Sequence, residues 1–258
     1  MKLAIVLLCV VAAVQARSTA VKVGHHQQSL AALGEKPWVV HLRLAISTSG
    51  FLESCTGALI DSSWVLTTAH CVRDVRFIWL RFGAVEVIRP ELVLESTNVI
   101  RNDDWNPLTQ ENNIALINVN RVIDLTSNID VIPLPAANSG LPDRANYCAY
   151  GESSPDTAGE FLRCWDVTIV AENQQAVIYE GEDISATEFD TGAPVVGDGV
   201  LLGVLSTKGE FRDEAVFIRT SAQVNWITGM TGLDFSRAPA PEQERQEAQD
   251  VIIVNDLN

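Results

Sequence analysis

Short apolar runs, separated by clusters of turn-forming residues, are the feature that most limits how this chain can fold. The runs are rich in β-branched and aromatic residues: WVVHLRLAI, RFIWLRF, EVIRPELVLE, IALINVN, WDVTIVAE, AVIYE, VLLGVLS and AVFIRT. The clusters between them, such as STSG, NDDWNP, AANSGLPD and GESSPD, favour turns. Many short strands at this spacing predict an all-β barrel or sandwich. The length of 258 residues suits two small barrels of roughly 100 residues each.

The segments outside these runs set the expected boundaries. The Pro- and Gly-bearing stretch near residues 133–143 is the expected connection between the two barrels. AQVNWITGMTG predicts a short helix close to the C-terminus. Residues 233–258 are mainly polar and acidic, with one apolar patch, VIIV, and most of them cannot bury enough surface to order themselves. We expect residues 233–258 to form an acidic flexible tail.

Residues 1–16 have the pattern of a secretory signal peptide. They combine Lys2, an apolar run, and small residues at Val14 and Ala16 that suit cleavage. The apolar run is too short to span a bilayer comfortably. We therefore expect a secreted, extracellular protein in which residues 17–23 form a short N-terminal segment ahead of the domain.

The cysteines fit an oxidising compartment. Five are present, and Cys9 leaves with the signal peptide, so that Cys55, Cys71, Cys148 and Cys164 remain. Three pairings are possible for four cysteines, and their order favours Cys55–Cys71 with Cys148–Cys164. Zinc binding is the alternative, but the spacings contain no CxxC. We expect disulfides and no metal.

The charge of the chain narrows the class of partner. Its formal net charge of -15 disfavours nucleic acid and anionic membranes. We expect no cofactor, and a monomer whose partners are other proteins.

The stretch SCTGALIDSSWVLTTAHCV carries the most specific information about function. It joins two cysteines through an apolar strand and places His70 beside the second of them. An ordinary half-buried histidine would fit the residues alone. The stretch, however, resembles the WVLTAAHC segment of trypsin- and chymotrypsin-like serine proteases. Further similar segments follow the family order around it: LGEKPWVVHL, NVIRNDDWNPLTQENNIALI, YCAYGESS, LRCWDVTIV, FDTGAPVV and AVFIRTSAQVNWI.

This resemblance covers residues 24–232 and implies two six-stranded antiparallel β-barrels followed by a short C-terminal helix. It also implies a catalytic triad in the order His, Asp, Ser. His70 matches the general base, but Asn113 stands at the position of the Asp and Thr191 at that of the Ser. An Asp-to-Asn change in such a triad costs roughly 10⁴ in kcat. Threonine keeps a hydroxyl but adds a branch at Cβ that restricts χ1.

The same resemblance assigns an oxyanion hole to Phe189 and Thr191. The family has glycine at the position of Phe189, whose backbone N–H must point at the developing negative charge. Losing one such donor costs about 10²–10³ in kcat. Asp190, between them, would pair with a new N-terminal amine after activation, yet no clear cleavage site precedes the domain. We expect Asp190 to stay solvated in a zymogen-like arrangement.

The substrate pocket implied by the resemblance is also altered. Ser185 falls at its base, which in the family indicates chymotrypsin-like preference. Ser206 and Lys208 lie in GVLSTKGE, and Lys208 replaces the glycine along which substrate backbone would pair as an added strand. Thr187 replaces a cysteine that normally braces this pocket.

These changes lead to a hypothesis of a secreted, non-catalytic serine protease homologue that acts by binding or regulation. Its targets would be a protease, an inhibitor or another secreted protein. One alternative is a weak chymotrypsin-like serine endopeptidase that uses Thr191 and His70. Another is an abundant secretory or storage protein without a specific partner.

Overall fold

The computed structural model describes residues 29–46, 50, 52–172, 174–179, 186–208 and 214–235. The expected signal peptide (residues 1–16), the segment 17–23 and all of the expected tail (residues 233–258) after residue 235 lie outside these ranges. Within the described part of the chain, no helix is long and apolar enough to cross a membrane.

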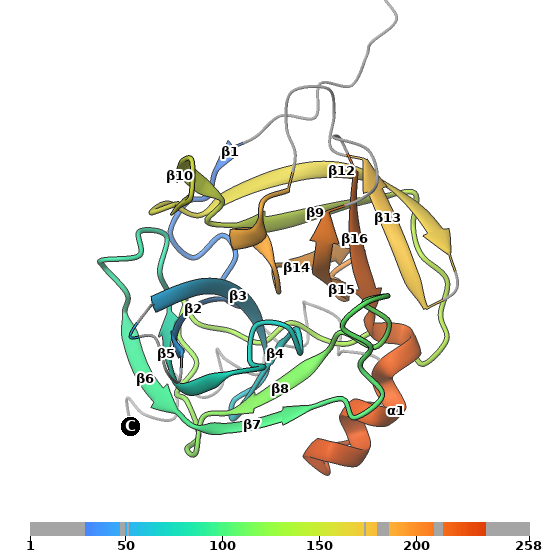
Figure 1. Cartoon of the computed structure of the whole chain (residues 1–258), viewed down its shortest axis with the longest axis horizontal. Helices are drawn as coiled ribbons and strands as arrows, with labels where there is room; N and C mark the ends of the chain where they lie inside the picture. The colour runs from blue at the N-terminus through green and yellow to red at the C-terminus, as the bar shows by residue number, and fades with distance from the viewer. Residues whose placement is uncertain are drawn as a thin grey trace, which may run out of the picture.

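The first barrel is built from the first half of the described chain (Figure 1, lower left). Its strands are β2 (Val39–Ile46), β3 (Leu52–Asp61), β4 (Trp64–Thr67), β5 (Val75–Phe82), β6 (Leu92–Ser96), β7 (Asn98–Arg101) and β8 (Ala115–Asn118). They pair antiparallel in the order β6-β5-β2-β3-β4-β8-β7. Only Thr97 separates β6 from β7, so the two form one bent strand that pairs with β5 and with β8. The sheet therefore closes as a six-stranded barrel.

The second barrel occupies the upper right of Figure 1. Its strands are β9 (Arg144–Ala149), β12 (Arg163–Glu172), β13 (Gln175–Tyr179), β14 (Pro194–Gly197), β15 (Val200–Lys208) and β16 (Glu214–Arg219). Strand β9 pairs with both β12 and β14, which closes the ring. Strand β1 (Ser29–Leu30) pairs with β12, and β10 (Glu152–Ser154) forms a small hairpin with β11 (Thr157–Ala158). The predicted all-β fold of two six-stranded antiparallel barrels is confirmed.

The predicted C-terminal helix is present as α1 (Thr220–Thr231). It ends at Gly232, whose left-handed φ of 72° suits a residue without a side chain. The barrels are connected by residues 119–143, which include the expected segment 133–143.

Each barrel has its own apolar core because alternate residues along the strands face inward. Leu42, Leu44 and Ile78 lie in the first core, and Tyr147 and Phe217 in the second. A third cluster combines residues from both barrels and from α1: Ala58, Leu66, Ile114, Leu201, Val204, Ile218 and Ile227. This shared cluster fixes one barrel against the other and so positions the loops that meet between them.

Both expected disulfide bonds are present, one in each barrel. Cys55 is joined to Cys71, and Cys148 to Cys164. The second pair lies directly opposite in the β9–β12 register.

Candidate active site

A cleft of about 510 Å³ lies where loops of the two barrels meet. Four of the sequence-predicted site residues line it: His70, Phe189, Thr191 and Ser206. Its full lining is His70, Gln110, Glu152, Asp156, Thr187, Glu188, Phe189, Thr191 and Ser206. The structure thus brings together residues that are far apart in the sequence.

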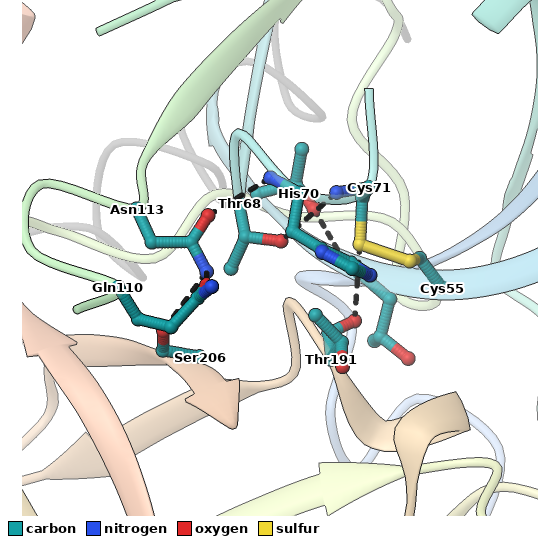
Figure 2. The surroundings of a disulfide bond; sticks show 10 residues. Cys55, Thr68, His70, Cys71, Gln110, Asn113, Thr191 and Ser206 are labelled. Carbon is teal, nitrogen blue, oxygen red and sulfur yellow. Dashed lines mark hydrogen bonds between the residues drawn. A yellow bond between two sulfur atoms is a disulfide. The ribbon is translucent and has the colours of Figure 1, made fainter. Parts of the chain in front are cut away.

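Asn113 is fully buried directly behind this cleft. Its Oδ1 accepts a hydrogen bond of 2.8 Å from the backbone N–H of His70. Its Nδ2 donates to Gln110 Oε1 at 2.9 Å and to Ser206 Oγ at 2.8 Å, as Figure 2 shows. A flipped amide would place NH₂ against the N–H of His70, so these three bonds fix its orientation. Both amide protons are used, and the group holds no negative charge.

The imidazole of His70 lacks the carboxylate that an aspartate in place of Asn113 would supply to stabilise its charged form. Among the described residues, no hydrogen bond joins the ring to Asn113 or to the hydroxyl of Thr191. Burial lowers the pKa of His70, and Arg73 lowers this pKa further, while Glu53 and Glu188 act in the opposite direction. The lowered pKa favours the neutral ring, so the cation that a general base becomes during catalysis is disfavoured.

The loop ahead of Thr191 forms a short 3₁₀ helix, η1 (Glu188–Asp190). The N–H of Asp190 donates to the carbonyl of Thr187 at 3.2 Å, and the N–H of Thr191 donates to that of Glu188 at 3.3 Å. An oxyanion hole requires the second of these N–H groups to face the cleft. In this structure, the Thr191 donor is occupied within η1. The defect therefore extends beyond the Phe189 side chain, which the sequence had singled out.

Asp190 is buried, with 1% of its surface exposed, so the expectation that it stays solvated is wrong. Its Oδ2 accepts hydrogen bonds from the backbone N–H of Thr187 at 2.6 Å and from the Thr187 hydroxyl at 2.9 Å. These donors replace water around the carboxylate. The spacing T-x-x-D, from Thr187 to Asp190, resembles a capping box and is the sequence signal that could have predicted this contact.

The backbone around Thr191 is pinned to the first barrel. The carbonyl of Thr191 accepts a hydrogen bond from the N–H of Thr56 at 3.0 Å. Gly192 follows with φ +85°, and a Cβ there would lie 2.0 Å from the carbonyl oxygen of Thr56. Only glycine fits this position. Thr191 itself is 8% exposed.

The predicted pocket residues are placed only in part. Ser206 is buried and accepts from Asn113. Lys208 ends β15 opposite Ala215, but its side chain lies outside the described part of the structure, as does all of Ser185. Gln110 was not predicted, and no motif marks it. It holds Asn113 from a backbone with φ 60°, and its carbonyl accepts from Gln175 of the second barrel.

The described residues contain no group of three or more His, Cys, Asp or Glu side chains able to hold a metal ion.

Comparison with known proteins gives a consistent result. The family model described as Trypsin matches residues 24–227. A trypsin from Squalus acanthias is 26% identical over 211 residues, which cover 74% of this chain and 89% of that protein. A collagenase from Hypoderma lineatum is 28% identical over 206 residues, covering 70% of this chain and 77% of the collagenase. The crystal structure of a scabies mite inactivated protease paralogue is similar in fold, with a TM-score of 0.69 at 21% identity, covering 79% of this chain and 99% of that one.

Proposed function

The chain belongs to the trypsin family, and we propose that it is a secreted, non-catalytic member that acts by binding or regulating other proteins. The observation that carries this proposal is the hydrogen bonding of Asn113. Its two amide protons are donated to Gln110 and Ser206. An aspartate at this place would accept a hydrogen bond from the imidazole N–H of His70 and stabilise the His70 cation, and Asn113 can do neither in this orientation.

The state of the oxyanion hole supports the same proposal. Thr191 donates its N–H to Glu188, and the backbone N–H of Thr187 donates to the carboxylate of Asp190. Loss of one oxyanion donor costs about 10²–10³ in kcat. This loss and that from Asn113 do not simply add, because the groups act as a unit. Each defect alone is sufficient to make hydrolysis slow.

The cleft nevertheless remains open to a polypeptide. Its volume of about 510 Å³ and its mixed wall of Phe189, His70 and acidic side chains suit a protein segment as ligand. The fold also occurs in a scabies mite protein described as an inactivated protease paralogue. We propose a protease, an inhibitor or another secreted protein as the target.

A weak chymotrypsin-like endopeptidase is the second candidate function. This function is favoured because His70 and Thr191, whose side chain bears a hydroxyl, line the same cleft. In that case His70 would be needed for turnover. The endopeptidase therefore predicts peptide cleavage that is lost in His70→Ala, whereas the non-catalytic protein predicts no such cleavage.

The test compares the wild-type protein with His70→Ala in a digest of a mixed peptide library, followed by mass spectrometry. We expect no cleavage that depends on His70, because neither the base nor the oxyanion donors are competent. An active trypsin-family enzyme in parallel is the control for the library. Cleavage after aromatic residues that disappears in His70→Ala would contradict the proposal and support the endopeptidase.

A further inference from the structure

A second cavity, of about 750 Å³, lies between the outer face of the first barrel and residues 157–160, and it shares no lining residue with the cleft. Strands β2 and β5 pair across its floor, with His41 opposite Arg81 and Arg43 opposite Trp79. Residues two apart on a strand face the same side of a sheet. Both arginines and Trp79 therefore lie together on this face, and all three are half-buried.

Among the described residues, the two arginines have few hydrogen-bond partners. Arg43 Nη1 donates to Ser54 Oγ at 3.1 Å, and Arg81 Nη1 lies 3.4 Å from His41 Nδ1. Burial, followed by Arg81 and Arg43, lowers the pKa of His41 to about 3, so the ring is neutral and its Nδ1 can accept. In the described chain, no carboxylate forms an ion pair with either arginine. Each guanidinium carries five N–H donors, and most are left for a ligand.

The two guanidinium groups also repel each other. Burial lowers the pKa of Arg81, and the next cause of this decrease is the charge of Arg43. Two neighbouring arginines that form no ion pair with a described carboxylate are unexpected in a chain with 33 acidic and only 18 basic residues. A bound carboxylate would relieve the repulsion and accept the free N–H groups bidentately.

The rim of the cavity adds aliphatic surface. Leu52, Ile88 and Val93 line it, and Ile88 is 72% exposed. The acidic residue on its wall, Glu160, is exposed to solvent. Two guanidiniums beside exposed aliphatic side chains fit a polypeptide that carries both carboxylates and aliphatic residues.

The C-terminal residues of the same chain have this chemistry. Residues 242–256 contain four acids before the run VIIV and one after it: Glu242, Glu244, Glu247, Asp250 and Asp256. The described chain ends at Phe235, which packs against a cluster that includes residues of the first barrel. From there to residue 250 an extended chain reaches about 50 Å, comparable with the roughly 45 Å diameter of a compact domain of this size. A tether of this kind also raises the effective concentration of the tail to about the millimolar range.

We propose that the two-arginine cavity binds the carboxylates of residues 242–256 of the same chain, with the VIIV run packed against its aliphatic rim. The proposal concerns a face that the cleft does not include, so it holds whether or not the cleft hydrolyses peptides.

The test measures amide hydrogen exchange of residues 246–256 in the full chain. We expect these amides to be protected in the wild type, and Arg43→Gln with Arg81→Gln to reduce their protection about tenfold or more, the effect of losing charge-assisted hydrogen bonds. The matched control is Arg121→Gln with Arg144→Gln, which changes the net charge equally at two exposed residues that do not line the cavity. This control should leave the protection unchanged.

A second pair of changes, Glu247→Gln with Asp250→Asn, removes the carboxylates without altering the barrel. This tail variant should reduce the protection as much as the Arg43→Gln/Arg81→Gln variant does. Because the tail variant leaves the arginines unchanged, a folding defect at the arginines cannot explain its loss of protection. Exchange at the rate of an unstructured peptide in the wild type would overturn the proposal, and so would protection that is independent of the arginines. Protection that vanishes on dilution would assign the tail to a second copy of the chain and would likewise overturn it.

Discussion

Replacing both Cys55 and Cys71 by alanine is expected to lower the free energy of unfolding by about 2–5 kcal/mol, whereas His70→Ala should change it by less than about 1 kcal/mol. The disulfide links residues separated by 16 positions, and both cysteines are buried. The neighbouring His70 contributes little because Asn113 binds its backbone N–H, which alanine retains. Denaturant unfolding of the two variants measures the difference.

The second disulfide provides a matched control for this prediction. Cys148 and Cys164 are also separated by 16 positions, so replacing both should cost a similar amount if restriction of the unfolded chain dominates. A loss in His70→Ala as large as that in the Cys55/Cys71 variant would contradict the prediction. It would mean that His70 has become a structural residue.

Restoring the two triad residues, with Asn113→Asp and Thr191→Ser, is expected to give no measurable acylation burst with an active-ester substrate. The scaffold and His70 remain, but the N–H of residue 191 is donated to Glu188, which leaves the oxyanion hole incomplete. The missing donor alone costs about 10²–10³. Stopped-flow measurement of the burst amplitude per mole of protein tests this directly.

Two further substitutions separate the remaining defects. Adding Phe189→Gly and Lys208→Gly to the Asn113→Asp/Thr191→Ser variant removes the side chains beside the nucleophile and at the end of β15. We expect only a small gain, because Asp190 stays bound to Thr187 and keeps η1 in place. A strong burst already in the double variant would show that Phe189 and Lys208 are harmless, and that the protease was silenced by the triad changes alone.

Most of the fold could be predicted because it depends on local patterns. The alternation of VVHLRLAI, with polar His41 and Arg43 facing outward, is enough to predict β2. Of the run EVIRPELVLE, which was predicted to be one strand, only the second half is a strand: β6 begins at Leu92, after Pro90. Proline cannot donate to a strand ladder, and the residues before it form turns instead.

The candidate site was less predictable, because its deciding contacts join residues distant in sequence. The order of segments was sufficient to locate Asn113 and Thr191. The partners of Asn113, which are Gln110 and Ser206, depend on how a loop with left-handed backbone meets β15. The carboxylate of buried Asp190 is bound by Thr187, only three residues away. The resemblance implied an N-terminal amine as the partner of Asp190, and without that amine we expected the carboxylate to stay solvated.

The most direct test of the non-catalytic proposal is the reaction of the purified protein with a fluorophosphonate probe, which labels an activated hydroxyl nucleophile. Intact mass and peptide mapping would be compared between the wild type and His70→Ala, with an active trypsin-family enzyme as the positive control. We predict no adduct at Thr191 in either protein, because His70 has no hydrogen bond to that hydroxyl and Asn113 cannot stabilise its cation. An adduct at Thr191 that disappears in His70→Ala would contradict the proposal.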